Sequence, residues 1–113
     1  MTGFKIFIVE DDPWYGEILA YHLGLNPDYS VSRFETAKDC IAKMHLKPDL
    51  VTIDFSLPDM NGDDLFRKIR EINPQLPVIV ISSQEEVSIA VNLLKMGVND
   101  YLLKDEATKD LLW

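Results

Sequence analysis

Short apolar runs alternate along this chain with longer segments in which apolar residues recur every three or four positions. A continuous apolar run bounded by polar and turn residues indicates a buried strand, whereas the longer spacing is typical of an amphipathic helix. The runs predict five strands, over 5–9, 29–34, 50–53, 78–81 and 100–103. The spaced segments predict five helices, over 13–24, 36–45, 62–73, 85–97 and 107–113.

Regular alternation of strands and helices predicts an α/β fold with a parallel sheet, because right-handed crossovers place helices on both faces. The strand over 5–9 is apolar throughout and is expected in the middle of the sheet, whereas 29–34 alternates and suits an edge. A doubly wound, flavodoxin-like five-stranded sheet in the order 2-1-3-4-5 satisfies both conditions. We expect one domain over 1–113, a fragment whose fifth helix is truncated after about two turns.

Local signals predict the ends and faces of the helices. Asp12 and Pro13 are typical of a helix start, and Gly24 and Gly97 are typical of helix ends. Apolar rows at helical spacing are expected on four helices: Trp14, Ile18, Tyr21 and His22; Ala37, Ile41 and Met44; Leu65, Ile69 and Ile72; and Val87, Ala90, Val91 and Leu94.

Composition limits the partners of this segment. Its 19 acidic residues against 11 Lys and Arg give a net charge of -8, which opposes binding to nucleic acids and to anionic membranes. The single cysteine, Cys40, excludes an internal disulfide and a multi-cysteine zinc site. No apolar run approaches the ~20 residues of a membrane span, and the first residues lack the pattern of a signal peptide. A cytoplasmic globular domain is expected.

Polar residues follow the predicted strands at the ends that a parallel sheet brings to one edge. They are Glu10 and Asp11, then Asp54, then Ser82, then Lys104. Clustered carboxylates repel one another unless a cation joins them, and oxygen ligands without His or Cys suit Mg²⁺. The sequence therefore predicts a magnesium site beside a lysine and a hydroxyl group. Taken alone, Asp54 could equally begin the turn that follows its strand.

This set of groups is suited to handling a phosphoryl group. The sequence contains neither GxxxxGK[ST] nor GxGxxG, so nucleotide binding is not indicated. A carboxylate can itself act as the nucleophile and form an aspartyl phosphate. Asp54, which projects from the strand over 50–53 with the predicted metal beside it, is the candidate.

Four motifs, in order along the chain, make it similar to a known family. They are V-E-D-D at 9–12, D-x-x-L-P-x-x-x-G at 54–62, P-V-I-V-I-S at 77–82 and G-x-x-D-Y-L-x-K at 97–104. With them the chain resembles the receiver domain of bacterial two-component response regulators, over nearly its whole length. The resemblance implies a signalling switch in a phosphorelay rather than a stand-alone enzyme, although such a domain assists its own phosphorylation and dephosphorylation.

The resemblance also implies roles for individual residues. Asp54 would accept a phosphoryl group from a sensor histidine kinase or a phosphotransfer protein. Asp11, Asp54 and the backbone carbonyl of Ser56 would bind Mg²⁺, with Glu10 acting mainly through a metal-bound water. Lys104 would pair with a phosphoryl oxygen.

Other residues would convert phosphorylation into a change of shape. Ser82 stands where the family has a switch hydroxyl, Ser83 leaves room for the phosphoryl group, and Tyr101 stands where an aromatic ring turns inward. Ser56 and Gln84 would tune the lifetime of the phosphoryl group. The fourth helix and fifth strand, with the fifth helix, would form the face read by an output domain, by a partner protein or by a second copy of the chain in a homodimer.

The chain departs from the family after Lys104, where Asp105 replaces the usual proline and adds negative charge near the site. This departure keeps open a pseudo-receiver, a protein-interaction module that is never phosphorylated. A Mg²⁺-dependent phosphatase would need a second acid where Ser56 stands, and a flavodoxin-like FMN binder would need a phosphate loop in place of the acidic segment 10–16. Residues beyond Trp113 in a longer gene product would reveal any output domain.

Overall fold

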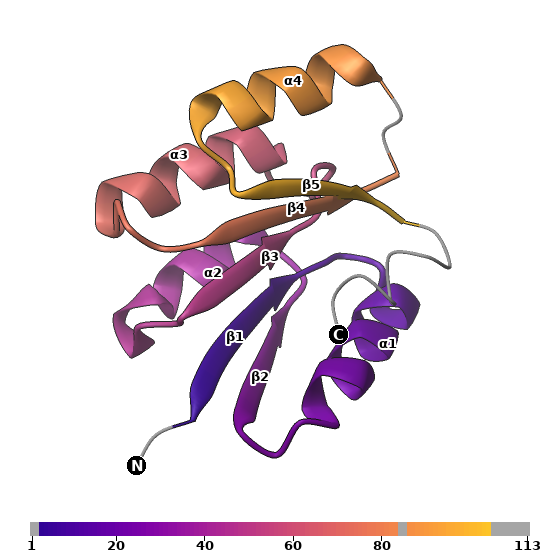
Figure 1. Cartoon of the computed structure of the whole chain (residues 1–113), viewed down its shortest axis with the longest axis vertical. Helices are drawn as coiled ribbons and strands as arrows, with labels where there is room; N and C mark the ends of the chain where they lie inside the picture. Colours follow the sequence, from indigo (N-terminus) through magenta and orange to yellow (C-terminus); the bar gives the residue numbers. More distant parts are fainter. Residues whose placement is uncertain (1–2, 84–85, 105–113) are drawn as a thin grey trace.

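A five-stranded parallel sheet forms the centre of the molecule (Figure 1). The computed structural model describes residues 3–83 and 86–104. The strands are β1 (Phe4–Val9), β2 (Tyr29–Phe34), β3 (Leu50–Ile53), β4 (Val78–Ser82) and β5 (Asp100–Leu103). They are hydrogen-bonded in the order β2-β1-β3-β4-β5, and every neighbouring pair is parallel. The doubly wound topology predicted from the sequence is confirmed.

Helices cover both faces of this sheet. They are α1 (Pro13–Gly24), α2 (Ala37–Ala42), the short 3-10 helix η1 (Met44–Leu46), α3 (Gly62–Ile72) and α4 (Val87–Met96). Among these described helices, α1 lies on one face, and α2, α3 and α4 lie on the other (Figure 1). None of them has the length and apolar character needed to cross a membrane. The predicted helix over 107–113, together with Gln84, Asp105 and Trp113, lies outside the described residues.

Two apolar cores, one on each face, hold the helices to the sheet. Successive strand residues point to opposite faces, so β1 supplies both cores. Phe7 and Val9 pack on the side of α2, α3 and α4, whereas Ile6 and Ile8 pack on the side of α1. All four side chains are buried, which explains why the β1 sequence is apolar without interruption.

The predicted helix over 36–45 is divided in two. Its start is confirmed, because the Thr36 hydroxyl accepts a hydrogen bond from the Asp39 N–H at 3.1 Å and caps the first turn. The α-helix ends at Ala42, since Lys43 leaves helical geometry with φ -107° and ψ 4°. The chain then continues as η1 before it enters β3.

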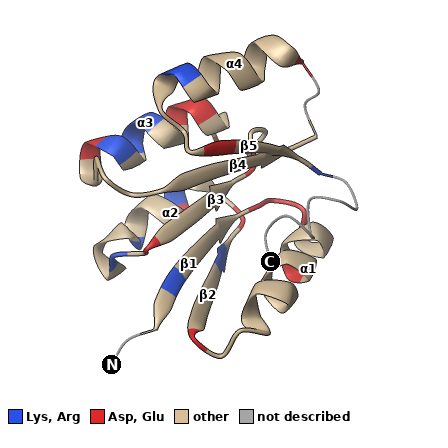
Figure 2. Cartoon of the chain, in the orientation of Figure 1, with Lys and Arg blue, Asp and Glu red and all other residues tan. Residues whose placement is uncertain are grey.

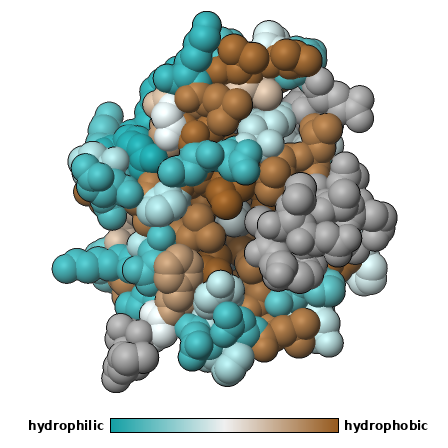
Figure 3. Space-filling view, in the orientation of Figure 1, coloured by the Kyte–Doolittle hydropathy of each residue, from teal (hydrophilic) through white to brown (hydrophobic). Residues whose placement is uncertain are grey.

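The buried faces of α1 and α4 differ from the predicted apolar rows, whereas Leu65 and Ile69 of the row predicted on α3 are buried as expected. The buried residues are Gly16, Leu19 and Leu23 on α1, Gly62, Leu65, Phe66 and Ile69 on α3, and Leu93 on α4. Several members of the predicted rows are exposed instead: Trp14, Tyr21, Ile72, Val87, Val91 and Leu94. Helices α1 and α4 carry apolar residues on more than one face, so periodicity alone does not select the face that meets the sheet. Figure 3 shows hydrophobic side chains gathered at the surface over α4.

Candidate functional site

The carboxyl ends of the strands bring four predicted site residues to one rim of the sheet. Glu10 follows β1, Asp54 follows β3, Ser82 ends β4 and Lys104 follows β5. Backbone hydrogen bonds fix this alignment, because the Asp54 N–H donates to the Val9 carbonyl at 2.9 Å and the Lys104 N–H donates to the Ser82 carbonyl at 3.0 Å. Figure 2 shows acidic residues on the loop that leaves β1 and a basic residue just after β5.

Lys104 joins two of the buried acids. Its Nζ lies 2.7 Å from Glu10 Oε1 and 3.2 Å from Asp54 Oδ2. The exposed fractions of the three side chains are 16% for Lys104, 3% for Glu10 and 6% for Asp54. Burial removes water from these charges, so the ion pairs are far less screened than pairs on the surface. The cationic end of Lys104 is therefore held against Asp54.

Asp11 completes a cluster of three carboxylates. One oxygen from each of Glu10, Asp11 and Asp54 lies within 4.8 Å of the others. Carboxylate oxygens at this spacing suit a hard cation such as Mg²⁺, which needs few protein ligands because it keeps several waters. Asp11 is exposed whereas the other two are buried, so the cluster opens to solvent on the side of Asp11.

Burial and like charge shift the ionisation of this cluster. Burial, followed by the neighbouring Asp54, raises the pKa of Glu10 to about 8, against the opposing effect of Lys104. The same two causes raise the pKa of Asp11 above its usual value. Burial alone would lower the pKa of Lys104, but the carboxylates of Glu10 and Asp54 leave it raised. The carboxylates of the site thus repel one another, and a cation bound among them would reduce this repulsion.

The loop after β3 folds back beside Asp54. The Ser56 N–H donates to Asp54 Oδ1 at 3.4 Å, and Ser56 forms an antiparallel bridge with Asn61. Gly62 closes the loop, where its N–H donates to the Phe55 carbonyl at 2.6 Å. A Cβ atom at Gly62 would lie only 3.0 Å from the Phe55 Cα, so the close approach favours glycine. This loop places the backbone of Ser56 next to the acid cluster.

The predicted switch residues lie on the two strands beyond β3. Ser82 is fully buried at the end of β4, and Ser83 after it is exposed. Tyr101 is half-buried on β5, where it pairs with Val80 and packs against the larger core. Ser82 and Tyr101 thus lie on adjacent strands, and Gln84 lies outside the described residues.

Two residues near the rim were not predicted from the sequence. The Tyr15 ring lies under Lys104, with 5.0 Å between Nζ and the ring centroid. The Asp59 carboxylate accepts hydrogen bonds from the N–H groups of Ala37 at 3.0 Å and Lys38 at 2.9 Å, and so ties the β3–α3 loop to α2. Both contacts join segments far apart in the chain, so no local pattern signals them.

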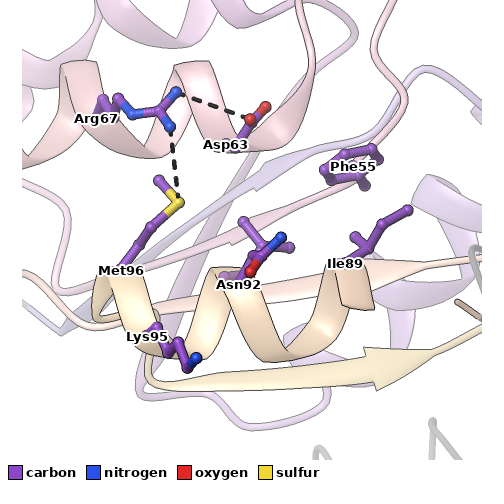
Figure 4. Close-up of a pocket in the computed structure, with 8 residues that line it drawn as sticks. Phe55, Asp63, Arg67, Ile89, Asn92, Lys95 and Met96 are labelled. Atoms are coloured by element: carbon purple, nitrogen blue, oxygen red, sulfur yellow. Dashed lines mark hydrogen bonds and ion pairs between the residues drawn. The ribbon is translucent and has the colours of Figure 1, made fainter. Parts of the chain in front are cut away.

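A groove of about 480 Å³ lies beside the rim, between α3 and α4 (Figure 4). Phe55 and Ile89 line one end of it, and Arg67 and Met96 line the other, where Arg67 Nη2 lies 3.9 Å from Met96 Sδ. Of the predicted site residues that the structure describes, none lines this groove. The acid cluster and Lys104 therefore lie at the rim and not in this groove.

The family model of the response regulator receiver domain matches residues 6–113. The chain therefore belongs to this family, whose members are the receiver domains of two-component systems. The parallel sheet and the acidic rim with its lysine are what the sequence resemblance implied, and the resemblance is confirmed.

Curated relatives of the chain carry regulatory names. It is 32% identical over 110 residues to the transcriptional regulatory protein CssR of Bacillus subtilis (strain 168), covering 97% of this chain and 48% of CssR. It is 36% identical over 101 residues to the transcriptional regulatory protein KdpE of Staphylococcus aureus, covering 88% of this chain and 43% of KdpE. It is 30% identical over 104 residues to the chemotaxis protein CheY of Thermotoga maritima, covering 90% of this chain and 86% of CheY. The chain thus spans about half the length of the first two relatives and most of the third.

Solved structures share the fold over almost the whole chain. The BeF3-activated N-terminal receiver domain of Klebsiella pneumoniae RstA superposes with a TM-score of 0.86 at 34% identity, covering 96% of this chain and 92% of that one. The signal receiver domain of a putative Luxo repressor protein from Vibrio parahaemolyticus superposes with a TM-score of 0.88 at 29% identity, covering 97% of this chain and 84% of that one. The arrangement of strands and helices is therefore that of receiver domains.

Proposed function

We propose that this chain is a phosphorylation-dependent signalling switch in which Asp54 accepts a phosphoryl group. The observation that carries the proposal is the position of Lys104 Nζ, 3.2 Å from Asp54 Oδ2 at the carboxyl end of the sheet. A buried ammonium group beside one carboxylate, with two further acids close by, provides both a nucleophile and a partner for the incoming negative charge.

The transfer itself would be a displacement at phosphorus. An Asp54 oxygen forms a bond to phosphorus while the bond from phosphorus to the donor breaks. The leaving group is an imidazole nitrogen when the donor is a phosphohistidine on a sensor kinase or phosphotransfer protein, and a carboxylate when it is a small acyl phosphate. Lys104 neutralises the phosphoryl oxygens as they approach Asp54.

A divalent cation fits the acid cluster and belongs to this proposal. Asp11, Asp54 and the Ser56 carbonyl would hold Mg²⁺, with Glu10 acting through a coordinated water. The bound ion supplies positive charge to the transferring phosphoryl group. The three carboxylates of the chain would meanwhile lose the mutual repulsion that raises the pKa of Glu10 and Asp11.

Signalling would follow from the new charge on Asp54. A phosphoryl dianion attracts hydrogen-bond donors, and the Ser82 hydroxyl on β4 would supply one, with Ser83 leaving room. Tyr101 on β5 would respond, and α4 with β5 would present a changed face to an output domain, a partner protein or a second copy of the chain. Ser56 and Gln84 would tune how long the phosphoryl group persists. In this role the chain is a cytoplasmic signalling domain over 1–113, not a stand-alone enzyme.

Labelling with a small acyl phosphate tests the proposal. In the presence of Mg²⁺, mass spectrometry should show one added phosphoryl group on the wild-type chain and none on Asp54→Asn. The matched control is Asp28→Asn, an exposed carboxylate just before β2, which should be labelled like the wild type. No added mass in the wild type would favour the pseudo-receiver, and equal labelling of Asp54→Asn would refute Asp54 as the acceptor.

A further inference from the structure

We infer that Tyr15 is a positioning residue that holds Lys104 in place for phosphoryl transfer, an inference that rests on the proposed function. The Lys104 Nζ lies above the Tyr15 ring at 5.0 Å from its centroid. Attraction between a cation and an aromatic face extends to about 6 Å and strengthens when water is excluded. Tyr15 is half-buried and Lys104 is mostly buried, so the contact is partly desolvated.

A closed circuit of contacts holds the ring in this position. Glu10 Oε1 binds Lys104 Nζ at 2.7 Å, and Glu10 Oε2 accepts a hydrogen bond from the Asp12 N–H at 3.1 Å. The Asp12 carboxylate caps α1 by accepting hydrogen bonds from the N–H groups of Trp14 at 3.0 Å and Tyr15 at 3.4 Å. The first turn of α1 is thereby fixed relative to Glu10. The ring of Tyr15, which lies in this turn, contacts Lys104.

The ring contact differs from the two ionic contacts of Lys104 in one respect. Glu10 and Asp54 are also the groups proposed to bind the cation and to carry the phosphoryl group. Carboxylates that take on those roles would change their ionic contacts with the ammonium group of Lys104. The Tyr15 ring binds neither a metal ion nor a phosphoryl group, so its contact persists. It would keep the flexible lysine side chain directed at Asp54 while the charges around it change.

A plain packing role makes a different prediction. Tyr15 also packs against the smaller core, which contains Leu19 and Ile81. If packing were its whole role, leucine at this position would serve nearly as well as tyrosine. If the ring positions Lys104, an aromatic face is required, and phenylalanine should serve where leucine does not.

The first test measures the contact without any phosphorylation. A ring current moves the resonances of protons above an aromatic face upfield, so the ε-methylene protons of Lys104 should lie upfield of those of exposed lysines. Their assignment comes from their loss in Lys104→Arg. The shift should remain in Tyr15→Phe and disappear in Tyr15→Leu. Unshifted Lys104 protons in the wild type would overturn the inference, whether or not any variant folds and whether or not Asp54 is phosphorylated.

The second test measures the consequence. At saturating Mg²⁺, Tyr15→Leu should lower the initial rate of acyl phosphate labelling about fivefold to tenfold, the effect of losing one partly desolvated cation–π contact. Tyr15→Phe should stay within about twofold of the wild type, and the Mg²⁺ affinity of all three proteins should be equal. The control is Tyr21→Leu, an exposed tyrosine of the same helix, which should label normally. Equal rates for the Leu and Phe variants would refute a positioning role, whereas a wild type that cannot be labelled refutes only the proposed function.

Discussion

Folding strongly alters the ionisation of Glu10. Its side chain is 3% exposed and its pKa rises to about 8, chiefly through burial and secondly through Asp54. Between about 4.5 and about 8, the folded chain therefore keeps a proton that the unfolded chain has lost. An acid with a raised pKa in the folded state costs stability above its unfolded pKa. The free energy of unfolding contributed by Glu10 thus falls as pH rises through this window.

Glu10→Gln should remove that part of the pH dependence. In urea denaturation without divalent cations, the variant should gain stability relative to the wild type between pH 5 and pH 8, because glutamine has no proton to lose. Glu17→Gln, on the exposed side of α1, is the matched control and should follow the wild type. If the free energy of unfolding changed with pH in the same way for the wild type and Glu10→Gln, the raised pKa of Glu10 would be contradicted.

For individual residues, the sequence predicts which side chains belong to the site better than it predicts the contacts between side chains. Glu10, Asp54 and Lys104 could be predicted because each directly follows a strand, and parallel strands deliver their carboxyl ends to one rim. The cation–π contact of Tyr15 could not be predicted, since it depends on the direction of two side chains and not on their spacing. The cap that Asp59 gives to α2 is hidden for the same reason.

Among the elements, α4 departs most from its sequence pattern. Its predicted row is largely exposed, and Leu93 is the residue of α4 that is buried, at 1% exposure. Leu93→Ala should therefore lower the free energy of unfolding by about 2–5 kcal/mol, the cost of a cavity in a packed core. Leu94→Ala, the adjacent residue at 47% exposure, should cost less than about 1 kcal/mol. Chemical denaturation of both variants measures the difference, and similar losses would mean that α4 packs through the predicted row.

The ambiguity in α4 has a simple physical origin. Its apolar residues form two rows at helical spacing, one through Val87, Val91 and Leu94 and one through Ile89 and Leu93. Either row could face the sheet, and in the structure Leu93 and Ile89 pack against the larger core. Periodicity predicts that a helix exists, while tertiary packing selects its buried face.

For the whole molecule, the order of the strands follows from two features of the sequence. The unbroken apolar run of β1 requires cover on both faces, which only a central strand receives, and the alternating run of β2 suits an edge. Right-handed crossovers then leave few other arrangements. The break of the second helix at Lys43 could not be predicted in this way, because the apolar spacing of Ala37, Ile41 and Met44 continues across it.

Magnesium should stabilise the whole fold through the acid cluster. The chain carries a net charge of -8, and three of its carboxylates lie together at the rim. Only the folded state assembles that cluster, so Mg²⁺ at about 100 times its Kd should raise the free energy of unfolding by about 2.7 kcal/mol.

Without divalent ions, Asp11→Asn should be more stable than the wild type, because it relieves repulsion from Asp54, yet Mg²⁺ should stabilise it little. Thermal unfolding in MgCl₂ and in NaCl of equal ionic strength separates site binding from general screening, with Asp28→Asn as the control that should respond like the wild type. A stabilisation that NaCl reproduces, or that persists in Asp11→Asn, would show that the rim is not the magnesium site.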